Sequence, residues 1–140
     1  TLIETYASRF AADSIKDEEI STIETNLDEV KMNPKSFELH YKADHHLHNT
    51  VTQYCDNDHI RTAQNYIRPH LERIRYFSIK ATDHRTIADA LKEHYQILEA
   101  LKEKDPGLIE SSLRSHLKNA EERMIDAIHT YTHLFSERFI

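Results

Sequence analysis

Four side chains with metal-binding chemistry fall at positions where a helix normally carries hydrocarbon. Asp44 and His48 lie four residues apart in the stretch 37–55, on a helical face that otherwise carries aromatic and aliphatic residues. His94 and His116 each interrupt an apolar stripe later in the chain. An unpaired buried polar group costs roughly 2–7 kcal/mol, so these side chains need partners in the interior.

A shared metal ion would supply those partners. A single histidine on a core face is usually explained by a hydrogen bond, but three stripes that each carry an imidazole, one with a carboxylate beside it, favour a common ligand. Three imidazoles and one carboxylate suit a divalent ion, with zinc first and nickel, manganese or iron as alternatives. Four protein ligands alone make a closed tetrahedral site, whereas five- or six-coordination leaves positions for water or a ligand oxygen. The spacing leaves both open.

Other histidines offer alternatives. His40 lies one helical turn before Asp44 and could replace a ligand or support one. His129 and His133 have the i, i+4 spacing of a ligand pair, but on the face opposite the apolar residues, where a solvated surface is the simpler interpretation.

The elements that position these residues are predicted to be helices. The chain has one Gly and three Pro in 140 residues and no run that alternates apolar and polar residues with period 2. We expect a compact all-α antiparallel bundle of six or seven helices, forming one domain over residues 1–140. The apolar stripes place helices at about 1–16, 17–33, 36–55, 60–77, 83–104 and from 105 onward, and Pro69 should kink or split the fourth.

Charge and composition exclude several classes. The net charge of −6 and the lack of a basic stripe argue against direct nucleic-acid binding by these residues. Cys55 is the only cysteine, which fits a reducing cytoplasm and excludes a cysteine-based zinc motif. No apolar run approaches the length of a membrane span. The chain starts inside an apparent helix, so we expect it to be part of a longer protein.

Four segments resemble, in order, the FadR C-terminal (FCD) ligand-sensing domain of GntR-type bacterial transcription regulators. Residues 44–48 (DHHLH) match its Asp-x-x-Phe-His motif, with Leu47 in place of Phe. The other matching segments are 2–12 (LIETYASRFAA), 93–101 (EHYQILEAL), and Asp105 followed by 113–117 (LRSHL).

The resemblance implies a helical bundle that binds a divalent metal through Asp44, His48, His94 and His116. It also implies a pocket for a small organic acid above the metal, a homodimer, and a preceding winged helix-turn-helix that contacts DNA and is absent from this chain. A sensor of this kind is not an enzyme.

The working hypothesis is therefore an effector sensor in which the metal and an arginine bind a carboxylate. Arg75, one position after Ile74, is the candidate arginine, with a solvated surface position as the alternative. Two other classes remain open: a metalloenzyme or oxygen carrier built on a helical bundle, and a metal-free interaction bundle with hydrogen-bonded histidines. The sequence has no phosphate-binding glycine loop, no Gly-x-Ser-x-Gly and no His-Glu-x-x-His.

Overall fold

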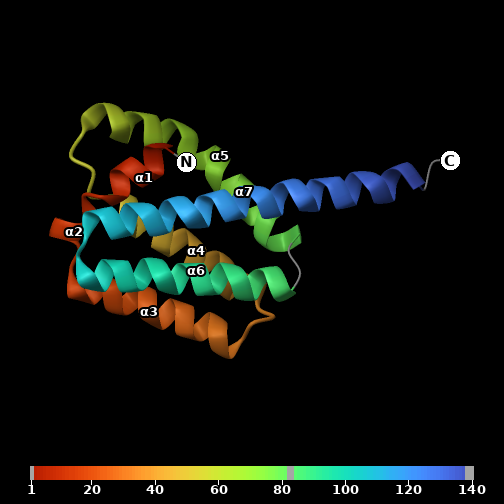
Figure 1. Ribbon diagram of the computed structural model, residues 1–140, viewed down its shortest axis with the longest axis horizontal. Helices are drawn as coiled ribbons and strands as arrows, with labels where there is room; N and C mark the ends of the chain where they lie inside the picture. Colours follow the sequence, from red (N-terminus) through yellow and green to blue (C-terminus); the bar gives the residue numbers. More distant parts are fainter. Residues whose placement is uncertain (1, 82–83, 138–140) are drawn as a thin grey trace.

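The computed structural model describes the backbone of residues 2–81 and 84–137, and the side chains of residues 2–81 and 86–129. This part of the chain contains seven helical segments and no strand, as predicted for an all-α bundle (Figure 1). They are α1 (Leu2–Ser8), α2 (Ala11–Ser14), α3 (Asp17–Met32), α4 (Phe37–Thr52), α5 (Asp58–Ala81), α6 (His84–Glu103) and α7 (Pro106–Glu137). The predicted start of the fifth helix, at residue 83, lies outside the described residues.

The prediction of one helix over residues 1–16 is wrong. The chain breaks into α1 and the single turn α2, and at the break the amides of Arg9 and Phe10 bond to carbonyls three residues back instead of four. This tighter turn places Ala7, Ala11 and Ala12 in the interior, with at most 2% of each residue exposed. Small side chains on both sides of the break let the two short helices pack closely on the bundle.

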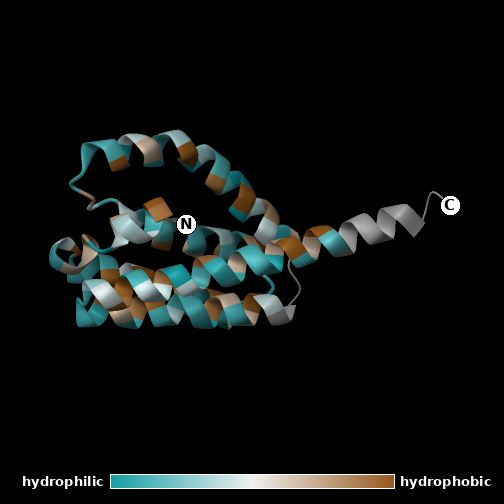
Figure 2. Ribbon diagram, turned by 45° about the horizontal axis from the view of Figure 1, so that its top comes forward, coloured by the Kyte–Doolittle hydropathy of each residue, from teal (hydrophilic) through white to brown (hydrophobic). Residues whose placement is uncertain are grey.

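Helix α5 runs through Pro69 without dividing. A proline in a helix interior removes one hydrogen bond and crowds the preceding turn, which bends or breaks the helix. Figures 1 and 2 show that α5 arches over the rest of the bundle as one curved helix, so the chain takes the bent form of the two alternatives.

The predicted core stripe of α5 is largely not buried. Ile74 is 51% exposed and Phe77 is 59% exposed, and Gln64 is the buried residue of this helix. The reason lies in what α5 faces. Ile74 lines a cavity between α5, α6 and α7, so the apolar face of α5 borders open space over part of its length.

The core is made by α3, α4, α6 and the first turns of α7. Leu27, Leu47, Leu98, Leu101 and Leu113 from these helices are all fully buried. Short connections fold α3 back on α4 and α6 back on α7, as Figure 1 shows, and hydropathy alternates around the helices in Figure 2 as expected of amphipathic helices. Asp44, His48, His94 and His116 each lie within one helical turn of one of these leucines, so the core fixes where they point.

Asp105 caps α7. Its Oδ1 accepts hydrogen bonds from the amides of Gly107 at 2.8 Å and Leu108 at 3.0 Å, and Pro106 occupies the first helical position. Asp105→Ala should therefore lower the free energy of unfolding by about 1 kcal/mol. Urea denaturation measures this, with Asp105→Asn as the control that keeps an acceptor and should lose much less. Equal losses in both variants would contradict the cap.

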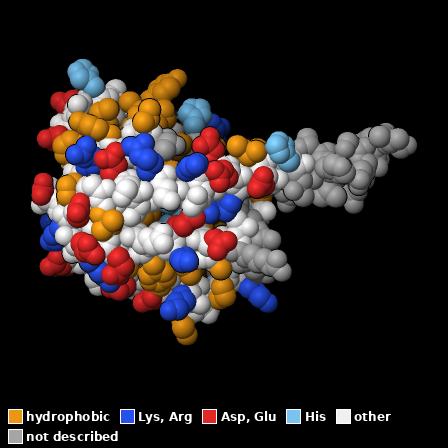
Figure 3. Space-filling view, viewed as in Figure 1, with side chains coloured by type: hydrophobic (Ala, Val, Ile, Leu, Met, Phe, Trp, Pro, Cys, Tyr) orange, Lys and Arg blue, Asp and Glu red, His pale blue; other side chains and the backbone are white. Residues whose placement is uncertain are grey.

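The surface carries both signs of charge. Figure 3 shows Lys and Arg side chains interspersed with Asp and Glu on one face, as expected from a net charge of −6 without a basic stripe. Within the described residues, every helix is too short or too polar to cross a membrane.

Candidate metal centre

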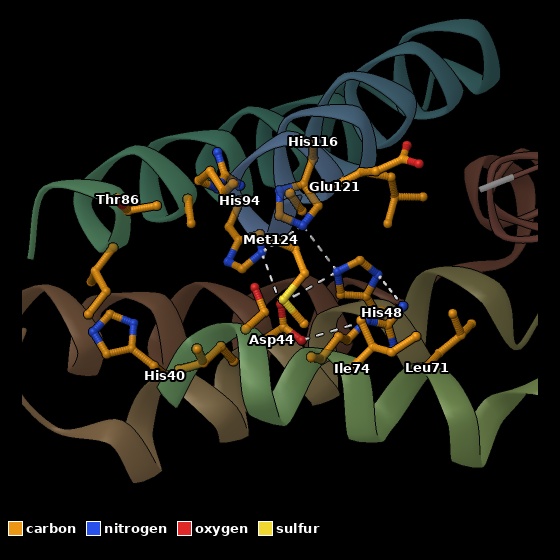
Figure 4. Close-up of a pocket in the computed structure, with 18 of the residues that line it drawn as sticks. His40, Asp44, His48, Leu71, Ile74, Thr86, His94, His116, Glu121 and Met124 are labelled. Carbon is orange, nitrogen blue, oxygen red and sulfur yellow. Dashed lines mark hydrogen bonds and ion pairs between the residues drawn. The ribbon is translucent and has the colours of Figure 1, made fainter. Parts of the chain in front are cut away.

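Asp44, His48, His94 and His116 come together in the interior. Asp44 and His48 come from α4, His94 from α6 and His116 from α7, and one ligand atom of each lies within 4.8 Å of the others (Figure 4). All four residues are buried, with between 1% and 7% of each exposed. Helix α4 and the later pair α6 and α7 thus bring the predicted donor set to one point.

The three imidazoles meet through Nε2. The Nε2 atom of His116 is 3.3 Å from that of His48 and 3.3 Å from that of His94. Asp44 Oδ1 lies 3.6 Å from His48 Nε2 and 3.5 Å from His94 Nε2. Neighbouring ligands of one ion with bonds of about 2.1 Å lie about 3.0–3.4 Å apart. The spacing of these atoms therefore fits one divalent ion between them.

Asp44 has an unsatisfied buried oxygen. Oδ2 lacks a hydrogen-bond partner among the described residues, although Arg75 Nε lies 3.8 Å away. Burial raises the pKa of the Asp44 carboxyl, but the facing His48 and His94 and the charge of Arg75 outweigh it and place the pKa well below its usual range. A cation bound beside Asp44 would compensate this buried negative charge and give Oδ2 a partner.

Two carboxylates orient two of the imidazoles. Glu93 Oε2 lies 2.8 Å from His116 Nδ1, and Glu4 Oε1 lies 3.4 Å from His48 Nδ1. When the Nδ1 proton is donated to a carboxylate, the Nε2 lone pair is directed at the centre, which is the tautomer that metal binding requires. Neither glutamate was predicted as part of the site, because no helical spacing places Glu4 beside His48 or Glu93 beside His116. The signal available for both was their place in two of the segments that match the FCD domain, 2–12 and 93–101.

Glu93 is itself fixed by α7. Arg123 donates to both of its oxygens at 2.8 Å, and Asn119 donates to Oε1 at 2.8 Å. Burial raises the pKa of the Glu93 carboxyl, but these hydrogen bonds and that of His116 hold it far below its usual range. The carboxylate therefore stays charged and keeps a single orientation toward His116.

Glu93→Gln should weaken metal binding by about 10–100-fold, because an amide accepts the Nδ1 proton less strongly and leaves His116 less basic. Competition with a chelator measures the affinity. The control is Glu122→Gln, which makes the same change at a position in α7 where the side chain is 63% exposed. Unchanged affinity in Glu93→Gln would show that Glu93 has only a structural role.

Arg75 lies at the same centre, on the cavity wall, with 15% of its side chain exposed. It pairs with Glu4. Burial raises the pKa of the Glu4 carboxyl, but His48 and Arg75 outweigh this effect and lower the pKa to about 2. Arg75 Nη2 also lies 3.1 Å from His48 Nδ1. That contact needs a lone pair on Nδ1, so it competes with the Glu4 contact that prepares His48 for a metal.

Without a metal, the centre should make stability depend on pH. Burial and the neighbouring His94 lower the pKa of His116 from 6.5 to about 4, and burial and Arg75 lower the pKa of His48. Between pH 6.5 and about 4 the unfolded chain therefore binds more protons than the folded chain. The free energy of unfolding of the metal-free protein should fall by a few kcal/mol as the pH decreases across this range.

Urea titrations of chelator-treated protein across this range measure the effect. His116→Gln should show a smaller drop, whereas an equal drop would assign the pH dependence to other groups.

A cavity of about 370 Å³ adjoins the four residues. Side chains from α1, α4, α5, α6 and α7 line it, and the cluster forms part of its wall (Figure 4). His40 also lines the cavity, but its Nε2 lies 3.0 Å from the carbonyl of Pro34, so it is not one of the cluster. Of the alternative pair His129 and His133, the His133 side chain lies outside the described residues.

Comparison with known proteins agrees with this geometry. A family model, described as the FCD domain, matches residues 1–119. Searches of curated proteins and of solved structures returned no match. The matched segment contains α1 to α6, the start of α7 and all four residues of the candidate centre. The chain therefore belongs to the FCD family, the FadR C-terminal domain found in GntR-family regulators.

Proposed function

We propose that this chain is the effector-sensing domain of a GntR-family transcription regulator, and that it binds a divalent metal and a small organic acid. The observation that carries the proposal is the buried cluster of Asp44, His48, His94 and His116 in the wall of a cavity of about 370 Å³. Membership of the FCD family, whose domains are regulatory ligand sensors, supports it. The ligand is bound and released, so no catalytic role is proposed.

The four clustered side chains are the proposed metal ligands, and zinc is the first candidate, with nickel, manganese and iron as alternatives. Imidazole nitrogens with one carboxylate suit all four ions, whose choice in a cell depends on geometry and availability. When bound, the metal supplies positive charge for an anionic ligand in a site of low dielectric.

Arg75 is the proposed second contact for the acid. It has five N–H donors, and the pair with Glu4 engages Nη2, so other donors can face a carboxylate in the cavity. Glu4 keeps the guanidinium at the cavity wall, and Glu4 and Glu93 keep His48 and His116 directed at the centre. The chain's own residues thus prepare both contacts.

Effector occupancy must favour one arrangement of the protein to regulate anything. We propose that residues 1–140 act as one domain, that two copies form a homodimer in the cytoplasm, and that a preceding winged helix-turn-helix contacts DNA. The ligand cavity borders α5 and α7, so occupancy would change how these helices sit on the bundle. Light scattering of the purified chain tests the dimer.

A screen of organic acids by thermal unfolding tests the proposal, with metal-loaded and chelator-treated protein in parallel. We expect at least one carboxylate to raise the melting temperature of the loaded protein by several degrees and to have little effect on the metal-free form. A fully folded protein that takes up no zinc, nickel, manganese or iron would instead support a metal-free bundle.

A further inference from the structure

The cavity beside the candidate centre is mostly apolar. Its lining includes Leu71 and Ile79 from α5, Leu91 from α6, and Leu117, Ala120 and Met124 from α7. Figure 4 shows Met124 beside the four clustered residues and Leu71 on the side of His48. Away from the proposed ligands, a molecule in this cavity would therefore contact mainly hydrocarbon, which favours an apolar body.

Both arginines at this cavity already have carboxylate partners. Arg75 pairs with Glu4, and Arg123 makes two parallel hydrogen bonds of 2.8 Å with Glu93. Both guanidinium groups are largely buried, with 15% and 19% of their side chains exposed. Arg75 still has N–H donors for one ligand carboxylate, but the charge of each arginine is already compensated, so neither could neutralise a second carboxylate of the ligand.

The charge balance of the site follows from these pairs. Among the buried or half-buried groups, Glu4, Asp44 and Glu93 contribute three negative charges and the two arginines two positive ones, which leaves one negative charge. Glu121 also lines the cavity, but it is exposed and its charge is screened by water. A divalent ion on neutral imidazoles changes this balance to one positive charge. One carboxylate then neutralises the site, whereas a dicarboxylate would leave excess negative charge in a buried, low-dielectric space.

We propose that the effector is a monocarboxylate with an apolar chain, and not a dicarboxylate or a sugar acid. This inference rests on the proposed function, whose ligand class it narrows. The volume of about 370 Å³ corresponds to about twelve water-sized groups of about 30 Å³, so an aliphatic acid of about six to eight carbons fits.

Calorimetric titration of zinc-loaded protein tests this with matched ligands. Hexanoate and adipate share one chain length, as do octanoate and suberate, and octanamide keeps the chain without the charge. We expect each monocarboxylate to bind at least about tenfold more tightly than its dicarboxylate and than the amide. Equal or tighter binding of the dicarboxylates would overturn the inference and leave metal-dependent acid sensing intact. Failure of every acid to bind loaded protein would overturn both.

Glu4→Gln provides an independent test, because it leaves Arg75 without its counter-charge. Adipate should gain affinity relative to hexanoate, so that the ratio of hexanoate affinity to adipate affinity falls several-fold. Metal content is measured in the same samples. Glu122→Gln, which removes an exposed charge on α7, should keep the wild-type ratio. A ratio unchanged in metal-loaded Glu4→Gln would contradict the charge balance.

Discussion

Asp44→Ala should abolish stoichiometric metal binding and lower the affinity for zinc by more than a hundredfold. Asp44 offers the carboxylate of the cluster, lies 3.5–3.6 Å from two of its imidazoles, and has one oxygen without a hydrogen-bond partner among the described residues. Loss of residues that only orient a ligand costs about 10–100-fold, so loss of a ligand itself should cost more.

Elemental analysis of protein purified without a histidine tag, followed by chelator competition, measures this effect. Asp44→Asn has nearly the same shape and tests whether the charge is what matters. His70→Ala removes an exposed histidine that is not part of the cluster and should leave metal content unchanged. Full metal content in folded Asp44→Ala would contradict the assignment of this residue.

Leu27→Ala should destabilise the domain by about 3 kcal/mol, and the melting temperature should fall by roughly 10 °C. Leu27 is fully buried in α3, which packs on both α4 and α6. Alanine would leave a cavity between α3 and the two helices that carry Asp44, His48 and His94, which are α4 and α6. Such a loss is a large share of the stability of an ordinary domain, about 5–15 kcal/mol.

Urea denaturation of chelator-treated protein measures this cost without a contribution from metal. Met32→Ala is the matched control, because it removes a side chain of similar size from the same helix where the residue is 79% exposed. The control should change stability by less than about 0.5 kcal/mol. A similar effect of both substitutions would mean that α3 does not anchor the bundle.

The clustering of the four candidate ligands follows from a sequence signal of unusual strength. Helical periodicity predicts which residues share a helix face, and a face that carries mostly apolar residues is expected to be buried. His94 and His116 could therefore be assigned to the interior from spacing alone. Arg75 lay one position beyond such a stripe, and its location on the cavity wall could only be suggested.

Helical periodicity could not predict the glutamates that orient the histidines, the break between α1 and α2, or the exposure of the apolar residues of α5. Glu93 faces α7 because α6 and α7 pack side by side, and its partner Arg123 is 30 residues away. The break between α1 and α2 comes from the packing of small residues, which leaves no Pro or Gly signal. The apolar residues of α5 looked like a core stripe because a cavity lining and a core have the same periodicity.

The centre combines residues of α4 with residues of the much later helices α6 and α7, and this has a consequence for biosynthesis. During translation Asp44 and His48 emerge together, but His116 follows His48 by 68 residues, which takes on the order of several seconds of synthesis. A nascent chain therefore offers an ion only an isolated carboxylate–imidazole pair. The complete donor set forms only after α7 has docked, so a metal ion bound by all four residues would be acquired by the folded bundle, after synthesis has passed this point.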